Sequence, residues 1–278
     1  MRYLYHYTSL ETLALILKNK TLCFNSLLNV DDVEEAQSKD MGKFGKFVYV
    51  SCWTEDSEES IPLWNLYTPN MHGVRIKLPE YPFKIYHFKK GDFFLDKDTN
   101  TYIDLANIYS ENKYSVTPDC LDLVKIKYDN NHDKLYPVVR KESYPGALQD
   151  FLKAKSLDEL KGKNIGVTYS FKEIGNYKRK NWEFQNEWRY KISIAPMGLQ
   201  ESNPPSFKKQ QEYFRRLEDR ITEPPYQRLF LNMDENALRK IEVVFGPRMT
   251  DAEKIMAVAL LEKYVPECKY KDSCLNIK

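Results

Sequence analysis

Apolar and polar positions near the N-terminus follow a strand period that then changes to a helical one. A strand is expected over 3–7, followed by Thr8-Ser9-Leu10-Glu11, a capping box in which Thr8 begins a helix and Glu11 reaches back to it. Apolar residues then recur every three or four positions up to Asn19-Lys20, where the helix is expected to end. The pattern predicts a second strand over 21–25.

The rest of the chain continues in the same mixed pattern. Further strands are expected at 47–53, 74–78, 83–88, 123–128, 187–194, 228–232 and 241–245. Helices are expected at 60–67, 148–160, 207–221 and 251–264, with a short helix in 29–37 capped by Asp31 or Asp32. Strands 74–78 and 83–88 are expected to pair as a hairpin, and Asn203-Pro204-Pro205 is expected to form a loop.

These elements predict a single α+β domain over 1–278, with a mixed or antiparallel central sheet and flanking helices. The stretch from about 91 to 163 is polar and poorly periodic, and we interpret it as an insertion over the sheet.

Composition narrows the class of protein. A hydrophobic fraction of 42% over 278 residues excludes a disordered chain, and a net charge of +2 excludes binding of nucleic acid through bulk charge, although a local basic patch stays open. The five cysteines are odd in number and lack CxxC spacing, which favours free thiols in a reducing compartment. Because no apolar run approaches the ~20 residues of a membrane span and the N-terminus lacks the pattern of a signal peptide, we expect a cytoplasmic protein without a membrane partner.

Three places combine polar residues with strand patterns. His6 lies in a strand that runs into a helix start, Ser51 and Trp53 end a strand that is followed by Trp64 and Tyr67, and Glu187 begins an aromatic strand. Each has a structural alternative. His6 would be a satisfied core histidine, the aromatics would pack in the core, and Glu187 would pair with Arg189 on the same strand face.

Two charge runs are less specific. Lys178-Arg179-Lys180 is either a solvated loop or a clamp for an anionic ligand. The acidic run 31–35 would suit Mg²⁺, but it has no companion His or Asp motif, so capping and a solvated helix face explain it better. No phosphate-binding glycine loop and no zinc motif is present.

Five segments carry a resemblance to a known family: Tyr5-His6-Tyr7-Thr8-Ser9, Phe24-Asn25-Ser26, Val50-Ser51-Cys52-Trp53-Thr54, Leu63-Trp64…Tyr67, and Trp182-Glu183…Glu187-Trp188-Arg189. Together they resemble the bacterial family called Domain of Unknown Function 2971, over most of the chain and most weakly at 91–163. Their layout is also similar to ADP-ribosyltransferases with a His-Tyr-Glu triad.

The resemblance implies roles for particular residues. By position, His6 would bond the adenosine ribose of NAD, Tyr67 (or Tyr49) would stack near the nicotinamide, and Glu187 would bond the nicotinamide ribose. Trp53 and Trp64 compete with Tyr67 for the middle role, and Glu183 competes with Glu187. The residues implied to hold NAD are His6, Tyr7, Thr8, Ser51, Trp53, Trp64 and Arg189. No metal is expected, because NAD supplies its own leaving group.

The resemblance thus predicts an ADP-ribosyltransferase-like enzyme that uses NAD as substrate and modifies nucleic acid or protein in a phage-defence or toxin context. An antitoxin or a second copy of the chain would be a further partner. The alternatives are an NAD glycohydrolase, with water as acceptor, and a non-catalytic nucleotide-binding or interaction protein.

Overall fold

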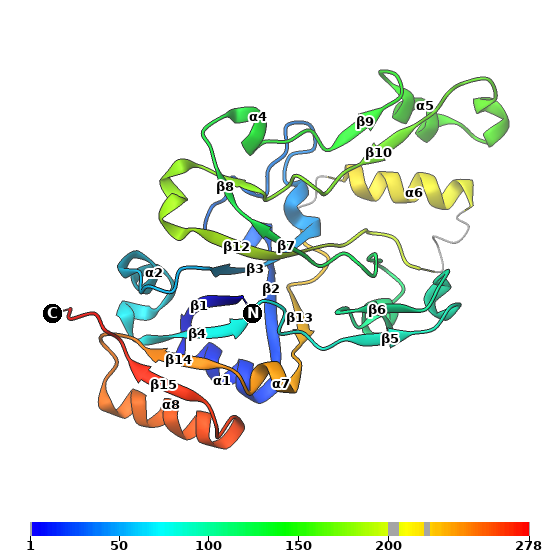
Figure 1. The fold of residues 1–278 in the computed structure, drawn as a ribbon. Coiled ribbons are helices and arrows are strands. Elements are labelled where there is room, and N and C mark those ends of the chain that lie inside the picture. The colour runs from blue at the N-terminus through cyan, green and yellow to red at the C-terminus, as the bar shows by residue number, and fades with distance from the viewer. Residues whose placement is uncertain (1, 200–205, 220–222, 278) are drawn as a thin grey trace.

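The computed structural model describes residues 2–199, 206–219 and 223–277 and has an α+β fold built on one large, mostly antiparallel sheet (Figure 1). The strands of this sheet are β1 (Tyr3–Ser9), β2 (Thr21–Ser26), β3 (Val48–Thr54), β4 (Gly73–Pro79), β7 (Asp122–Lys125), β12 (Glu187–Ser193), β13 (Arg228–Asn232), β14 (Glu242–Phe245) and β15 (Lys269–Asp272).

Six shorter strands form three two-stranded sheets. They are β5 (Tyr86–Phe88) with β6 (Thr99–Thr101), β8 (Lys127–Tyr128) with β11 (Tyr177–Lys178), and β9 (Arg140–Glu142) with β10 (Val167–Tyr169).

The α-helices are α1 (Leu10–Asn19), α2 (Ile61–Tyr67), α3 (Leu105–Tyr109), α4 (His132–Leu135), α5 (Ala147–Lys153), α6 (Phe207–Glu218), α7 (Glu235–Leu238) and α8 (Asp251–Tyr264). Short 3-10 helices are η1 (Leu27–Asn29), η2 (Phe44–Phe47), η3 (Pro69–Met71), η4 (Asp92–Phe94), η5 (Leu157–Leu160) and η6 (Lys180–Gln185).

The central sheet forks at β3. On one edge, β3 pairs with β1 at Thr54 and with β2 at Tyr49 and Val50, so residues 51–53 lie where β1 and β2 diverge. One branch continues through β4, β14 and β15, and the other ends at β13. In Figure 1, β2 and β13 accordingly run steeply across strands β1 and β4. On its other edge β3 pairs with β12 along its whole length, and β12 pairs with β7.

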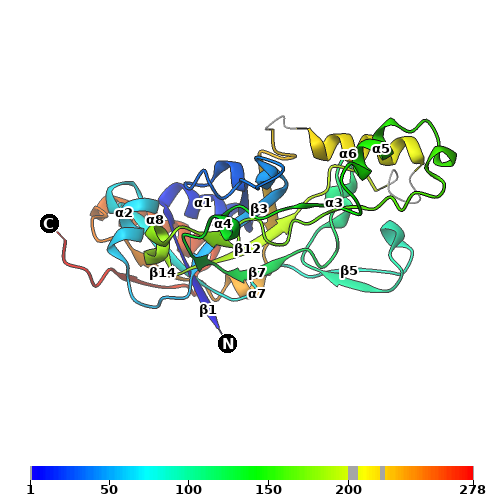
Figure 2. The same cartoon turned by 90° about the horizontal axis from the view of Figure 1, so that it is seen from above.

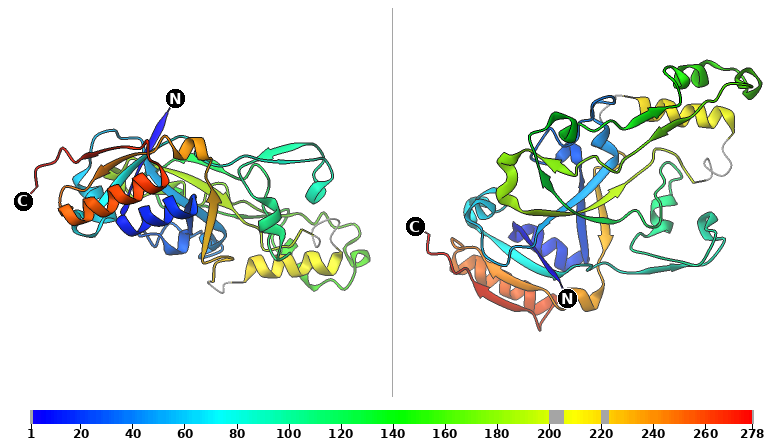
Figure 3. Two further views of the ribbon diagram at one scale, coloured as in Figure 1. Left: turned by 90° about the horizontal axis from the view of Figure 1, so that it is seen from below. Right: turned by 45° about the horizontal axis from the view of Figure 1, so that its top comes forward.

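The main core lies between the sheet and two helices. The helices α1 and α8 pack side by side on one face of the sheet (Figure 3). Leu13 and Leu17 of α1 and Leu261 of α8 are buried there with the inward side chains of the strands. Two arms extend from the sheet in one direction, one carrying β9, β10, α5 and α6 and the other β5 and β6 (Figures 1 and 2).

The fold class is the predicted one, with a mostly antiparallel central sheet and flanking helices, and most expected elements appear close to their predicted bounds. The prediction that 74–78 and 83–88 pair as a hairpin is wrong. Both edges of β4 are already occupied by β1 and β14, and β5 pairs with β6 instead. The expected loop at 203–205 lies outside the described residues.

Three local expectations also need correction. Because Thr8 and Ser9 still pair with β4, α1 starts one residue later than predicted, and Ser9 caps it by accepting a hydrogen bond from Thr12 N. The segment 29–37 forms turns after η1 and no α-helix, with Glu34 N bonded to Asp32 Oδ1. The stretch 91–163 is not only an insertion over the sheet, since it supplies β7 to the main sheet.

Within the described part of the chain, none of the helices combines the length and the apolar character that crossing a bilayer requires.

Candidate active site

A small cavity of about 50 Å³ lies at the fork of the sheet, between β1, the end of β3, α2 and the start of β12. We call it the inner cavity. It is lined by Tyr5, His6, Tyr7, Cys52, Trp53, Thr54, Leu63, Tyr67, Gln185 and Glu187. Four segments far apart in the sequence therefore converge on one space, as Figure 1 shows for their elements.

The imidazole of His6 is fixed at the fork by the backbone of β3. Its Nδ1 lies 2.7 Å from the carbonyl oxygen of Cys52, and its ring lies against Trp53 with ring centroids 5.0 Å apart. Burial lowers the pKa of His6, and the hydrogen bond to Cys52 only partly opposes this. A neutral imidazole that donates from Nδ1 to a carbonyl carries no proton on Nε2. His6 therefore offers a hydrogen-bond acceptor to a ligand.

The hydroxyl of Tyr67 has a defined direction because of Gln185. Lys178 Nζ donates to Gln185 Oε1 at 2.8 Å, which turns the amide NH₂ toward Tyr67, and Gln185 Nε2 then donates to Tyr67 Oη at 2.6 Å. Burial raises the pKa of Tyr67, so its proton stays on the oxygen. Since Oη accepts from Gln185, the O–H of Tyr67 is free to donate elsewhere. Tyr67 thus offers a hydrogen-bond donor to a ligand, whereas His6 offers an acceptor.

The turn before β12 sets the position of Glu187. Asn186 adopts a left-handed conformation (φ 38°, ψ 54°) that ends η6. Its carbonyl accepts from Thr54 Oγ1 at 3.1 Å and its Nδ2 donates to Asp56 Oδ1 at 2.7 Å, so the turn is held against the end of β3. Asparagine is one of the few residues that adopt this conformation readily. Glu187 N then donates to Tyr128 Oη at 2.8 Å.

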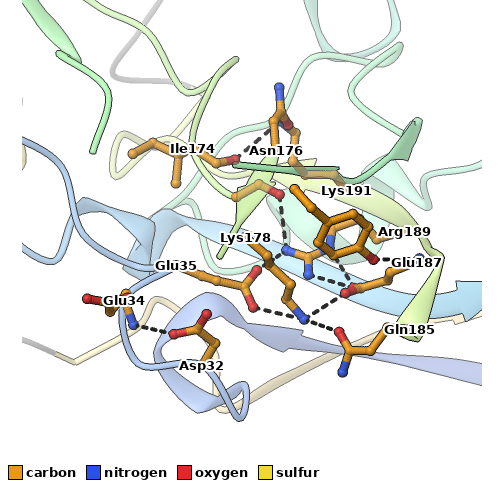
Figure 4. A network of polar contacts seen from close by, with 12 residues as sticks. Asp32, Glu34, Glu35, Ile174, Asn176, Lys178, Gln185, Glu187, Arg189 and Lys191 are labelled. Carbon is orange, nitrogen blue, oxygen red and sulfur yellow. Dashed lines mark hydrogen bonds and ion pairs between the residues drawn. The ribbon is translucent and has the colours of Figure 1, made fainter. Parts of the chain in front are cut away.

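Glu187 is one of four charged side chains that are buried together, with Glu35, Lys178 and Arg189 (Figure 4). Arg189 donates to Glu187 Oε1 from Nε at 2.8 Å and from Nη2 at 2.6 Å, and its Nη1 bonds Glu35. Lys178 Nζ lies 2.7 Å from Glu187 Oε2 and 3.1 Å from Glu35 Oε1. Two positive and two negative charges balance in this group, which we call the ionic cluster.

A glycine next to the ionic cluster allows the backbone to approach the guanidinium of Arg189. The carbonyl of Gly175 accepts from Arg189 Nη1 at 3.0 Å. Gly175 has φ +72°, and a Cβ there would lie 2.6 Å from Leu27 Cδ1 and 3.4 Å from Arg189 Nη1. A residue with a side chain would therefore be strained and would crowd the guanidinium.

The two carboxylates of the ionic cluster differ in their tendency to ionise. Burial alone would raise the pKa of Glu187, but Arg189 and Lys178 outweigh it and hold that pKa at about 2. Burial raises the pKa of Glu35, because the same two cations compensate only partly and Glu187 adds a like charge. A proton taken up by the ionic cluster therefore goes to Glu35, and Glu187 stays a carboxylate.

Cys52 lines the inner cavity beside this carboxylate. Burial and the charge of Glu187 raise the pKa of the thiol well above its ordinary value. A thiol in this state is a poor nucleophile. The arrangement therefore does not favour cysteine-based covalent chemistry.

A second, larger hollow continues from the inner cavity along the other side of the fork. We call it the outer groove. It has a volume of about 510 Å³ and runs over α1, β2 and β13. It shares His6, Tyr7, Cys52, Trp53 and Tyr67 with the inner cavity, and Thr8, Ser51 and Asp31 lie along it. The two hollows therefore adjoin at these five shared residues, which include His6 and Tyr67.

The residues named from the sequence divide into those that line these hollows and those that do not. His6, Tyr7, Trp53, Tyr67 and Glu187 line the inner cavity. Thr8 and Ser51 line the outer groove.

Trp64 and Arg189 line neither hollow, and the expectation that they contact a ligand needs correction. Trp64 is fully buried behind Tyr7, with its Nε1 bonded to Glu59. Arg189 is fully buried under Glu187, with its guanidinium held by Glu35, Glu187 and Gly175. Both support residues that line the inner cavity.

The competing assignments are also separated by position. Tyr49 is fully buried and its hydroxyl bonds the backbone of Tyr226, so it lines neither hollow. Glu183 is exposed in η6 and lines neither hollow. The position of Glu187 agrees both with a residue that contacts a ligand and with a structural partner of Arg189. It lines the inner cavity and it is also the ion-pair partner of Arg189.

The interpretation of 178–180 as a clamp for an anion, or as a solvated loop, is wrong for Lys178, whereas Arg179 lies at the surface and Lys180 is exposed. Lys178 is buried in the ionic cluster, and Arg179 pairs with Glu34. Glu34 and Glu35 of the acidic run supply the carboxylates for Arg179 and Lys178, and Glu35 is buried, so it does not lie on the solvated helix face expected for this run. Among the residues at 2–199, 206–219 and 223–277, no three His, Cys, Asp or Glu side chains gather in a way that could hold a metal ion.

Sequence reasoning missed Gln185, Cys52 and Glu35 as parts of this region. Gln185 and Cys52 lie within motifs already singled out for their neighbours, so their proximity to Glu187 and Trp53 was the available signal. No sequence signal pointed to Glu35, because its partners Lys178 and Arg189 lie more than 140 residues away.

In comparisons of the whole chain with protein-family models, with curated proteins and with solved structures, nothing matches it.

Proposed function

We propose that this chain binds NAD at the inner cavity and transfers its ADP-ribose to an acceptor, with Glu187 as the catalytic carboxylate. The observation that carries the proposal is that His6, Tyr67 and Glu187, from β1, α2 and β12, line one cavity. They are the three residues that the motif layout selects, and nothing in local sequence requires them to meet.

The polar groups of the inner cavity suit a ribose and a flat heterocycle. His6 Nε2 accepts from a ribose hydroxyl, since Nδ1 is already used on the Cys52 carbonyl. The rings of Tyr67 and Trp53 offer aromatic surface for the nicotinamide. The dinucleotide extends from the inner cavity into the adjoining end of the outer groove, because the two hollows share five lining residues.

Glu187 acts as positive charge develops on the sugar. The C1′–N bond breaks with its electron pair moving to the nicotinamide nitrogen, so neutral nicotinamide leaves. The acceptor then forms a bond to C1′ and loses its proton to solvent. A carboxylate bonded to the ribose 2′-hydroxyl strengthens its hold in such an oxocarbenium-like state, as in glycoside hydrolysis. Arg189 and Lys178 keep Glu187 ionised for this role at neutral pH.

One observation favours a second candidate, a non-catalytic nucleotide-binding protein. Both oxygens of Glu187 are already held, Oε1 by Arg189 and Oε2 by Lys178, so part of its charge is neutralised within the protein. A carboxylate held in this way positions a hydroxyl well but responds less to charge on a ligand.

The proposal is tested by incubating the full chain with NAD, alone and with single-stranded DNA, RNA and protein acceptors, while nicotinamide release and labelling of the acceptor are followed. Nicotinamide release that needs an acceptor supports the transferase. Release with water alone identifies an NAD glycohydrolase. A rise in melting temperature with NAD but no release under any condition identifies the binding protein, and no interaction with NAD contradicts the proposal altogether.

A further inference from the structure

The far end of the outer groove is a two-stranded ribbon whose one face is polar and open. Among the described strands, β13 is the edge strand of its branch and pairs with β2, and at its end the carbonyl of Asn232 accepts from Lys84 N at 2.9 Å. The register places Arg228 opposite Asn25, Phe230 opposite Cys23, and Asn232 opposite Thr21. Along β13 these three residues are exposed, whereas Leu229 and Leu231 between them are buried in the core.

Phe230 and Arg228 stand out on this face. The ring of Phe230 is 51% exposed although it lies on a regular strand beside the groove. Arg228 is exposed two residues before it, so both side chains leave the same face of β13. No carboxylate among the described residues forms an ion pair with Arg228. The ribbon thus offers a flat apolar ring and a positive charge side by side, with Glu111 in the hollow next to them.

The rest of the outer groove has a mixed lining, in which neutral polar side chains alternate with apolar ones such as Leu15, Leu22 and Val30. Thr12 and Asn19 of α1 face it from one side, and Thr21, Asn25 and Asn29 from the other. Hydroxyl and amide groups of this kind bond sugar and base edges but repel an apolar peptide, which would leave them without partners. The chemistry therefore suits a ligand with a flat ring, a negative charge and many hydrogen-bonding groups.

A single nucleic-acid strand has this combination. Its bases expose π-faces that stack on aromatic side chains, and its phosphates bind arginine. In a duplex the base faces are hidden, so an isolated phenylalanine on a strand would find nothing to stack on. The distance at Arg228 is also suitable, because Arg228 lies opposite Asn25 and Asn25 opposite Val50, which puts β13 two strands, about 10 Å, from β3 at this register. A strand held at β13 can present a neighbouring nucleotide at the fork.

We propose that the face formed by Phe230 and Arg228 binds single-stranded nucleic acid, with a base stacked on Phe230 and a phosphate at Arg228, and that this strand is the acceptor of the ADP-ribose. The binding stands on the geometry of the ribbon alone. The role as acceptor rests on the proposed function.

The binding is measured by fluorescence anisotropy with labelled 12-nucleotide strands of mixed sequence, as DNA and as RNA, and with the corresponding DNA duplex. The full chain is expected to bind at least one single strand more tightly than the duplex. Phe230→Ala is expected to weaken that binding by roughly 5- to 100-fold, the range for loss of one stacked base. Arg228→Ala is expected to weaken it and to reduce the slope of log K against log salt by about 0.7.

Two substitutions outside the groove serve as matched controls. Phe94→Ala removes an exposed phenylalanine of the β5–β6 arm, and Arg239→Ala removes an exposed arginine after α7. Both are expected to leave binding of the strand unchanged. The proposal is overturned if the wild-type chain binds no single strand, if it prefers the duplex, or if Phe230→Ala and Arg228→Ala bind as tightly as the controls.

The outcome is separable from that of the proposed function. Strand binding that depends on Phe230, in a chain that never releases nicotinamide, upholds the binding site and contradicts both the enzyme and the acceptor role. Acceptor-dependent nicotinamide release that is unchanged in Phe230→Ala and Arg228→Ala upholds the enzyme and contradicts this acceptor site. If only a protein acceptor is labelled, the enzyme is likewise upheld and this nucleic-acid acceptor site is contradicted.

Discussion

Arg189 donates two hydrogen bonds to a single oxygen of Glu187, from Nε at 2.8 Å and Nη2 at 2.6 Å, across two positions of one strand face. The pair is almost completely buried, and Glu187 is the member that reaches the inner cavity. A carboxylate with this partner is ionised and rigid. The same contact therefore keeps Glu187 ionised at the inner cavity and stabilises the strand that carries it.

Removal of Arg189 is expected to destabilise the protein strongly. In Arg189→Met the side-chain volume is largely kept, but Glu187 and Glu35 share only Lys178 as a cation. Breaking a buried ion pair from one side costs about 3 to 5 kcal/mol. Urea denaturation measures the loss. Arg179→Met is the control, because Arg179 also pairs with a glutamate of the same loop but at the surface, and little change is expected. Equal stability of the two variants would contradict a structural role for the ionic cluster.

Gln185 and Tyr67 are expected to act as one unit. Gln185→Leu removes the donor to Tyr67 Oη, and Tyr67→Phe removes the hydroxyl that Gln185 Nε2 bonds. Once either partner is lost, the second substitution has less to remove, so the double variant should lose less stability than the sum of the single ones. A coupling of about 0.5 to 3 kcal/mol is expected for groups in direct contact. Urea denaturation of the four proteins gives this value, and strictly additive losses would show that Gln185 does not orient Tyr67.

The pH response of His6 is expected to differ from that of an exposed histidine. Its pKa is lowered below 6.5 by burial, so the folded state holds this proton less tightly than the unfolded state. Stability from neutral His6 is then fully present above pH 6.5 and decreases as the pH falls from 6.5 through the lowered pKa. An NMR titration of the imidazole should give a midpoint below 6.5, and His6→Gln should lack this part of the pH dependence. A midpoint at or above 6.5 would mean that His6 is open to water.

The sequence was sufficient for the elements that depend on local pattern. The strand expected at 47–53 forms as β3 at 48–54, and the helix expected at 60–67 forms as α2, which Ser60 caps. His6, Tyr67 and Glu187 were selected by the resemblance and not by local pattern, and the structure shows that the three line one cavity.

Long-range pairing was beyond local pattern. Lys178 looked like part of a solvated basic run, yet it is buried because Glu35 and Glu187 approach it from distant segments. The expected helix at 29–37 does not form, and two glutamates of this segment pair with distant arginines instead, Glu34 with Arg179 and Glu35 with Arg189. The hairpin failed for a similar reason, because β14, far along the chain, takes the edge of β4. Whether a charged residue is buried, and which strand occupies the edge of a sheet, depends on partners that lie far away in the sequence.

Nicotinamide release by Glu187→Gln and Glu35→Gln, measured in single turnovers with saturating NAD and expressed per folded molecule, tests the central claim most directly. Both substitutions remove one carboxylate from the same ionic cluster, but only Glu187 lines the inner cavity. If Glu187 is catalytic, its variant should lose rate by on the order of 10², the scale for one transition-state contact, while the folded fraction of Glu35→Gln releases nicotinamide at close to the wild-type rate. Equal rates per folded molecule in the two variants would contradict the account and leave Glu187 as a structural partner of Arg189.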